Sequence, residues 1–377
     1  MIAVGPLRAE HHASHGKLLT ALDVADCPPG RVDAVVVPTN RPTAHLYAVL
    51  DVAAALDRPL VALTSGHASA ARTAKLARDR GVEALALDVR DLCGSVMPRL
   101  ATGKVLRGTE FERRTDTSLK RNLGLLVSWV AGWERVAFLD DDITVPRPAD
   151  LDAAAGLVSD GYAAVGLDVG GFPDNSVVCH AHRETGGEQG TFIGGGALVV
   201  GNGSMTSFFP NVYNEDWFFL LDDRGLRRSA RAGEVLQKPY DPFANELRAQ
   251  TEEFGDCLAE GVFALLDDEG GFEAAADEGY WWEFLLGRAN LIDGILDRIR
   301  SSNRQDDEAL RMEIALRAAR KRCDAIPPSL CVRYLKALAQ DRRTWAWHVE
   351  WHPCGATDLR GALNVLGLAG HGIHVTR

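Results

Sequence analysis

The sequence predicts an α/β fold, in which a mostly parallel sheet has helices on both faces and is followed by a C-terminal helical region. Two observations predict it. Up to about residue 242, short apolar runs alternate with helix-like stretches, which is typical of parallel strands joined by crossover helices. Beyond Phe243 the pattern changes to long helical stretches, and the apolar stripe from Leu291 to Ile299 indicates a helix that packs on a core.

The expected strands are apolar runs too short for most helices and bounded by turn-like residues. They are Val32–Pro38, Leu60–Thr64, Val82–Leu87, Arg135–Thr144, Ala163–Asp168 and Thr191–Val200. The expected helices are Thr43–Leu56, Ser69–Arg80, one through Leu119, Leu123, Val127 and Val130, Ala149–Val158, and a short one at Asn214–Leu221. The polar stretches Cys93–Thr117 and Gly170–Gly190 are expected to be irregular. This order divides the 377 residues into an N-terminal extension, 1–30, an α/β domain, 31–242, and a helical region, 243–377.

Composition argues against several classes of protein. No stretch reaches the roughly 18 apolar residues of a membrane helix, and residues 1–17 lack the apolar core of a secretory signal. The net charge of −11 argues against nonspecific nucleic-acid binding. The seven cysteines are odd in number and scattered, which is untypical of a disulfide framework or a structural zinc site. We therefore expect a cytoplasmic protein without a membrane span or a nucleic-acid partner, and assembly into a homo-oligomer stays open.

Three aspartates, Asp140, Asp141 and Asp142, end the apolar run that begins at Arg135. On a strand, residues i and i+2 point the same way, so Asp140 and Asp142 share a face and Asp141 opposes them. Ligands of open α/β sheets collect beyond the carboxyl ends of strands. Two carboxylates repel each other there unless a cation lies between them, and Mg²⁺ takes one or two carboxylates together with substrate phosphates. Mg²⁺ or Mn²⁺ is the expected ion, whereas the motif taken alone also fits a solvated acidic turn.

Neighbouring motifs strengthen this signal. The runs 35–42 (Val-Val-Val-Pro-Thr-Asn-Arg-Pro), 120–124 (Lys-Arg-Asn-Leu-Gly) and 138–142 (Phe-Leu-Asp-Asp-Asp) precede 194–197 (Gly-Gly-Gly-Ala) and 214–217 (Asn-Glu-Asp-Trp). In this order they resemble the large GT-A family of glycosyltransferases, which includes polysaccharide synthases and many small sugar transferases. The motifs span roughly half of the chain and are more specific together than singly. No Gln-x-x-Arg-Trp motif follows, which argues against a processive synthase.

The resemblance implies a GT-A domain at 31–242, with the helical region on the acceptor side or as a lid. It implies metal-dependent transfer of a sugar from a UDP- or GDP-sugar to an unidentified acceptor, with inversion favoured. The implied donor-binding residues are Pro38, Thr39, Asn40 and Arg41 at the base and ribose, Arg121 at the diphosphate, and Asp140 and Asp141 near the ribose or sugar. Asp142, with Asp140, is the implied ligand of Mn²⁺ or Mg²⁺.

The implied catalytic residues are Asp216, as the general base of an inverting reaction, and Glu215. The alternative is that Glu215 is the base and Asp216 caps the helix. The candidate acceptor-binding residues are Gly195, Gly196, Trp217, His180 and His182. Glycines 194–196 let a backbone approach the acceptor, or they mark a strand bulge.

Two other interpretations stay open. The run from Asp140 to Thr144 also fits an Asp-x-Asp-x-Thr nucleophile motif and resembles haloacid-dehalogenase-type phosphatases, although three strand–helix units precede it here. The second is a catalytically silent domain that binds a nucleotide-sugar. It stays open because Leu63–His67 has no carboxylate, whereas the GT-A family usually carries acidic residues after its second strand.

Three further features are interpreted as structural by default. His348 and His352 would lie at i and i+4 on a helix, where a packing face is commoner than a metal site. Trp281 and Trp282 are expected to pack in the core, with sugar stacking as the alternative. The run Arg224–Arg231 is expected to be a solvated face.

Overall fold

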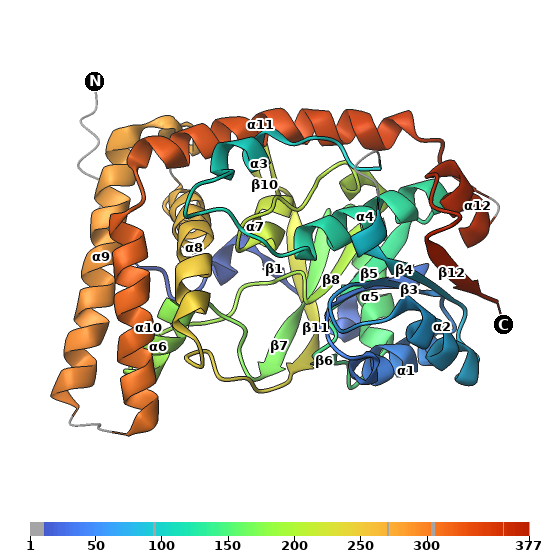
Figure 1. The fold of residues 1–377 in the computed structure, drawn as a ribbon, viewed down its shortest axis with the longest axis horizontal. Helices are drawn as coiled ribbons and strands as arrows, with labels where there is room; N and C mark the ends of the chain where they lie inside the picture. The colour runs from blue at the N-terminus through green and yellow to red at the C-terminus, as the bar shows by residue number, and fades with distance from the viewer. Residues whose placement is uncertain (1–10, 93–95, 270, 303–305, 357, 377) are drawn as a thin grey trace.

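The computed structural model describes residues 11–92, 96–269, 271–302, 306–356 and 358–376. Ten strands of this part of the chain form one sheet, in the order β1-β11-β7-β8-β5-β2-β3-β4-β12, with β6 beside β11 (Figure 1). They are β1 (Thr20–Ala21), β2 (Ala34–Thr39), β3 (Leu60–Thr64), β4 (Ala84–Asp88), β5 (Arg135–Leu139), β6 (Ile143–Thr144), β7 (Ala164–Gly171), β8 (Ala197–Gly201), β11 (Ser229–Gln237) and β12 (Gly372–Val375). A separate hairpin pairs β9 (Leu221–Asp222) with β10 (Gly225–Leu226).

The helices cover both faces of the sheet. In the first part of the chain they are α1 (Tyr47–Leu56), α2 (Ala70–Asp79), α3 (Ala101–Leu106), α4 (Thr117–Ala131), α5 (Ala149–Ser159), α6 (Val177–Glu184) and α7 (Glu215–Phe219). In the second part they are α8 (Glu246–Asp267), α9 (Glu278–Ser301), α10 (Asp307–Asp324), α11 (Pro328–Trp351) and α12 (Leu359–Val365). No helix in the described part of the chain combines the length and apolar character needed to span a membrane.

The sheet is mostly parallel. Strands β5, β2, β3 and β4 run parallel to one another, and so do β1, β11 and β7. Strand β8 is antiparallel to both of its neighbours, β5 and β7, and β12 is antiparallel to β4. The predicted fold class, a mostly parallel sheet with helices on both faces and a C-terminal helical region, is confirmed.

Alternation along the strands divides the interior into two cores. Because successive strand residues face opposite sides, Val36 points into the core that contains α4 and the C-terminal helices, whereas Val35 and Val37 point into the core that contains α1 and α5. Both faces of β2 are therefore buried, which explains why its sequence is continuously apolar instead of alternating.

Local sequence fixes where the C-terminal helices begin. Helices α8, α9, α10 and α12 each follow an Asn or Asp whose side chain accepts a hydrogen bond from a backbone N–H of the first turn, namely Asn245, Asp277, Asp306 and Asp358. Helices α9, α10 and α11 form the outer frame of the molecule, with α11 along the top in Figure 1.

Several elements differ from the prediction. Residues 191–196 are not strand, so β8 begins only at Ala197, and the supposedly irregular stretch 170–190 contains α6. In the run Arg224–Arg231, which was expected to be a solvated face, Arg224, Arg228 and Arg231 are exposed, whereas Ser229 and Ala230 are buried at the start of β11. Strands β1 and β12 lie outside the predicted α/β domain yet extend its sheet, so the domain boundaries remain a prediction.

The cysteines of the described residues are all free. Four of them, Cys179, Cys257, Cys323 and Cys331, are buried among core residues, while Cys354 is exposed. Cys93 lies outside the described residues.

Candidate active site

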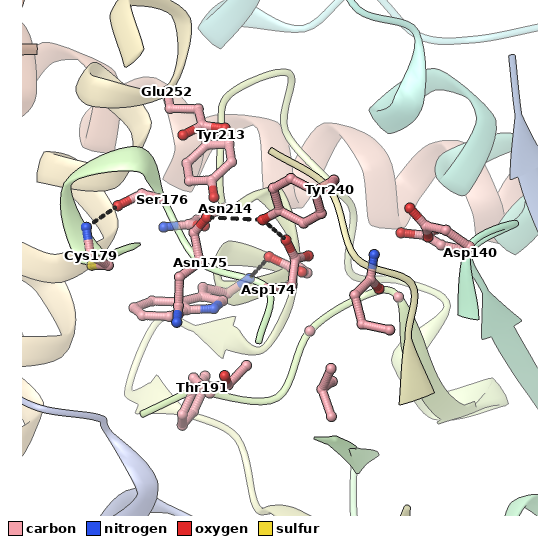
Figure 2. A pocket seen from close by; sticks show the side chains of 18 of the residues that line it. Asp140, Asp174, Asn175, Ser176, Cys179, Thr191, Tyr213, Asn214, Tyr240 and Glu252 are labelled. Carbon is pink, nitrogen blue, oxygen red and sulfur yellow. Dashed lines mark hydrogen bonds between the residues drawn. The ribbon is translucent and has the colours of Figure 1, made fainter. Parts of the chain in front are cut away.

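A cavity of about 650 Å³ lies beyond the carboxyl ends of β2, β5, β7 and β11. Asp140 and Asp142 line it from the turn after β5, and Asp216 lines it from α7. Helix α8 contributes the opposite wall, and Figure 2 shows Tyr240 and Asp174 between Asp140 and Glu252 of α8. The cavity therefore lies where open α/β sheets commonly bind their ligands.

Arg121, which is buried on α4, connects the two acidic motifs. Its Nη2 donates to both carboxylate oxygens of Asp140, each at 3.0 Å, and its Nη1 donates to Glu215 Oε1 at 2.7 Å. Glu215 also accepts from Arg113 Nη1 at 2.8 Å. These charge-assisted bonds bring residues from three separate motifs together, although Arg113 comes from a polar stretch in which sequence reasoning assigned no role.

The aspartates after β5 divide as predicted between the cavity and the interior, although they lie in a turn instead of on a strand. Asp140 and Asp142 line the cavity, whereas Asp141 is buried. Asp141 accepts a hydrogen bond from the Thr39 hydroxyl at 2.5 Å and forms an ion pair with Arg41 Nη1 at 3.1 Å. Arg41 Nη2 also donates to Asp142 Oδ2 at 2.6 Å. Asp141 thus holds the end of β2 against the end of β5.

Of the predicted base-binding run 38–41, Arg41 lines the cavity and Pro38, Thr39 and Asn40 do not. The carbonyl of Thr39 accepts from Lys120 Nζ at 2.9 Å, and the same nitrogen donates to Ser65 Oγ at 2.7 Å. Lys120 therefore lies beside the end of β3, where the run Leu63–His67 contains no carboxylate. Its own pKa is lowered by burial.

Three consecutive glycines precede β8 because functional side chains lie against their backbone. A Cβ on Gly195 would be 2.5 Å from the guanidinium carbon of Arg121, and one on Gly194 would be 2.9 Å from Asp216 Oδ2. Moreover, Gly195 N donates to Asp216 Oδ2 at 2.7 Å. Only glycine permits this close approach, so the segment fixes Arg121 and Asp216 relative to each other.

Asp216 and Glu215 are neighbours with opposite electrostatic environments. Burial raises the pKa of Asp216 to about 6, and the charge of Glu215 adds to this while Arg121 opposes it. Burial also favours a higher pKa for Glu215, but Arg113 and Arg121 outweigh it and hold the pKa of that carboxyl below its ordinary value. Asp216 can therefore exchange a proton near neutral pH, whereas Glu215 stays ionised in its pair of ion bridges.

The other predicted acceptor residues are only partly at the cavity. Trp217 lines it and packs edge-on against Phe192. His180 and His182 do not line it. His180 is buried with Nε2 2.9 Å from the Tyr240 hydroxyl, and burial lowers its pKa to about 3, while His182 Nδ1 lies 2.9 Å from Arg298 Nη2. His180 therefore packs against Tyr240 and His182 against helix α9, and neither reaches the cavity.

The features interpreted as structural lie away from the cavity. His348 Nε2 lies 2.9 Å from the Val96 carbonyl, and the His352 carbonyl accepts from Trp129 Nε1. Trp281 is fully buried, as expected, whereas Trp282 is exposed.

Sequence reasoning missed most of the wall opposite Asp140. Glu252, Asp256 and Glu260 line the cavity from one face of α8. Each has an ion-pair partner: Glu252 pairs with Arg248 and Glu260 with His15, both of which also line the cavity, and Asp256 pairs with the buried Arg288. The signal in the sequence was three carboxylates at i, i+4 and i+8 among the apolar residues of a helix. Because carboxylates are rarely buried without a specific partner, such a row indicates a functional or paired set.

The chemistry of the donor set fits a divalent cation at Asp142 and Asp140. Both carboxylates line the cavity, and Asp142 forms an ion pair with Arg41, whose side chain is partly exposed. Burial raises the pKa of Asp140 to about 7, and Asp142 and Asp141 add to this while Arg121 opposes it. Asp140, Asp141 and Asp142 share two arginines, Arg41 and Arg121, and Arg121 is also paired with Glu215. One or two carboxylates with room for phosphate oxygens are what Mg²⁺ and Mn²⁺ sites typically offer.

No protein-family model matches the chain, and no curated protein matches it either. Solved structures do. A mannosyltransferase, PcManGT from Pyrobaculum calidifontis in complex with GDP-Man and Mn²⁺, is 16% identical over 90% of this chain and 89% of that chain, with a TM-score of 0.40. Mannosyl-3-phosphoglycerate synthase from Rubrobacter xylanophilus is 15% identical over 61% and 79%, with a TM-score of 0.39.

A third solved structure, TarS of S. aureus (residues 1–349) with UDP-GlcNAc, is 13% identical over 78% of this chain and 90% of that chain, with a TM-score of 0.32. The type of protein that these matches name agrees with the resemblance seen in the sequence. With TM-scores below 0.5, they assign no activity to this chain.

Proposed function

We propose that this protein is a metal-dependent glycosyltransferase, which moves a hexosyl group from a UDP- or GDP-sugar to a hydroxyl group of an acceptor with inversion. One observation carries the proposal. Arg121 and the glycine segment 194–196 bring the paired carboxylates Asp140 and Asp142 and the proton-accepting Asp216 into one cavity at the carboxyl ends of the strands. Transfer of one sugar requires that the groups that bind the donor diphosphate and the group that deprotonates the acceptor hydroxyl lie close to the same sugar.

On the donor side, we propose that Asp142 and Asp140 hold Mn²⁺ or Mg²⁺. Such an ion, when bound, neutralises charge that develops on the departing nucleoside diphosphate. Arg41 and His45 line the same part of the cavity and can contact the donor. Arg121 already pairs with Glu215 through Nη1 and with Asp140 through Nη2, so its proposed role changes from direct phosphate contact to positioning of Asp140.

On the acceptor side, we propose that Asp216 is the general base and that Glu215 is not. Asp216 accepts backbone N–H bonds from Gly195 and Trp217, which hold its carboxylate in place, and it forms no ion pair with any of the residues that the structure describes. With a pKa of about 6, it is mostly ionised at neutral pH and still basic enough to take the proton of a hydroxyl group as that oxygen attacks the sugar. Trp217 supplies an apolar surface at the same wall.

The geometry does not favour the phosphatase alternative. The run from Asp140 to Thr144 follows β5, after the strand–helix units that begin at β2, β3 and β4, whereas the nucleophilic aspartate of such a phosphatase would end the first strand of its core.

The proposal is tested by measuring release of nucleoside diphosphate from a panel of UDP- and GDP-sugars with simple sugars and polyols as acceptors, with and without Mn²⁺. We expect release from at least one donor that needs both Mn²⁺ and Asp216. Binding of a donor without any release, across the panel, would instead support the silent nucleotide-sugar-binding domain.

A further inference from the structure

The outward face of α11 combines cations with exposed tryptophans. Arg333, Lys336, Arg343, Trp347 and Trp351 are exposed and recur at helical spacing along one side of this helix; we call them the α11 stripe. Trp347 is 64% exposed and Trp351 is 72% exposed, and their ring centroids are 5.5 Å apart. Two adjacent tryptophans left this open to water need an explanation, because most large aromatic side chains are at least partly covered.

The cations of the stripe are not used inside the molecule. Within the described part of the chain, Arg333, Lys336 and Arg343 form no ion pair, and Glu350 is the one carboxylate that shares their side of the helix. The protein as a whole carries a net charge of −11. A basic stripe on such an acidic molecule sets which face can approach an anionic surface, since the remaining surface is repelled.

A basic cavity adjoins the same helix. Asp341 of α11 accepts from the backbone N–H groups of Ala101 and Thr102 at 2.6 and 2.8 Å, which fixes the start of α3 beside α11 (Figure 1). Next to α3 is a cavity of about 590 Å³, and its lining combines three exposed cations with apolar side chains. The cations are Arg99, Lys104 and Arg107, and the apolar residues include Met97, Leu100, Leu119 and Phe209. No carboxylate is among the described residues that line it.

We infer that α11 lies flat on a lipid bilayer that contains anionic lipids, with the α11 stripe as the contact surface. Tryptophan rings favour the boundary between headgroups and acyl chains, and lysine and arginine are attracted to anionic headgroups. The stripe is roughly 27 Å long at 1.5 Å per helical residue, which suits a helix that lies in the plane of the interface. The cations that line the cavity beside α3 can contact an anionic headgroup, and its apolar side chains can contact the first part of the acyl chains. This inference is independent of the proposed glycosyl transfer.

Co-sedimentation with vesicles tests it. The full chain is mixed with vesicles of pure phosphatidylcholine, or of phosphatidylcholine with phosphatidylglycerol at about one lipid in three, at low and at high salt. We expect binding to the anionic vesicles only, and weaker binding at high salt. Trp347→Ala/Trp351→Ala should weaken binding by about tenfold or more, and Arg333→Glu/Arg343→Glu by at least about 25-fold, since each interfacial cation contributes about fivefold.

Matched controls separate the stripe from general surface effects. Trp282→Ala removes a tryptophan that is 66% exposed on α9, and Arg72→Glu/Arg78→Glu reverses two exposed cations on α2. Both controls should bind like the original chain, and all variants should keep its melting temperature because the changed side chains are exposed. The inference is overturned by absent binding, by equal binding to neutral vesicles, or by equal loss in the controls. It is also overturned if the tryptophan variant changes the oligomeric mass but not vesicle binding, since a second copy of the chain then covers the stripe.

Discussion

Replacing Asp216 by asparagine separates catalysis from folding. Asparagine has the size of aspartate and can still accept one of the two backbone N–H bonds that Asp216 receives from Gly195 and Trp217. It cannot take a proton. We therefore expect turnover to fall by on the order of 10²- to 10⁴-fold, the range associated with loss of a general base, with donor affinity nearly unchanged.

The structure also gives the sign of the stability change. The pKa of Asp216 rises from an ordinary 3.8 to about 6, so the folded state holds this proton more tightly than the unfolded state. The resulting stabilisation is fully present below pH 4 and is lost as pH rises through 6. At pH 8 the ionised group costs on the order of 3 kcal/mol, since each pKa unit corresponds to about 1.4 kcal/mol. The asparagine variant avoids this cost of ionisation, but the loss of one backbone hydrogen bond lowers its free energy of unfolding by about 1–3 kcal/mol.

We thus expect Asp216→Asn to be about as stable as the original chain at pH 8 and less stable at pH 4. Urea unfolding at the two pH values measures this, and steady-state release of nucleoside diphosphate measures turnover. In the original chain, kcat/KM should rise through pH 6 and level off above it, as the base loses its proton. Glu215→Gln serves as the companion variant.

Two results would refute this reasoning. Wild-type turnover in Asp216→Asn together with inactivity in Glu215→Gln would make Glu215 the base. A product with retained anomeric configuration, read from the coupling of the anomeric proton by NMR, would remove the need for a base at this position.

Three further variants test other parts of the site. Asp142→Ala should abolish the gain in nucleotide affinity that Mn²⁺ provides, as measured by titration calorimetry with and without the metal. The fold should be little affected, because the side chain is near the surface of the cavity. An undiminished gain contradicts the metal role. Arg121→Ala should lower the free energy of unfolding by about 3–5 kcal/mol, because Asp140 and Glu215 lose a buried partner; urea unfolding within 1 kcal/mol of the original chain argues against it. Gly195→Ala should lower turnover by about tenfold or more and destabilise by about 1–3 kcal/mol, because its Cβ would displace Arg121; unchanged kinetics would show that the segment is flexible.

Much of the fold was predictable because parallel strands buried on both faces leave a simple signature. Ala34–Thr39, Leu60–Thr64 and Ala84–Asp88 are strands where apolar runs predicted them. Strand β11 was not predicted because it lies near the edge of the sheet and its buried residues alternate with exposed ones such as Arg231 and Glu234, so its sequence contains no continuous apolar run. Strand β12 escaped because it is four residues long and its pairing with β4 is set by distant contacts.

The candidate site was predictable where a motif carried the chemistry and not where the fold brings single residues together. Asp140, Asp142 and Asp216 line one cavity, and they come from motifs. Arg113 and Tyr240 reach the same cavity from stretches without any motif, because their roles depend on loop paths that sequence periodicity does not encode. His180 and His182 were predicted to contact an acceptor but do not line the cavity, because His180 contacts Tyr240 and His182 contacts Arg298 of α9.

The most direct test of the central claim is a thermal-shift titration of the original chain and Asp142→Ala with UDP, GDP, CDP and dTDP, each with and without Mn²⁺. Because a ligand that binds only the folded state raises the melting temperature, we expect UDP or GDP to raise it in the original chain, strongly with Mn²⁺ and weakly without. Asp142→Ala should lose the Mn²⁺-dependent part. If no nucleoside diphosphate raises the melting temperature, or if Asp142→Ala responds as the original chain does, the cavity is not a metal-dependent nucleotide-sugar site.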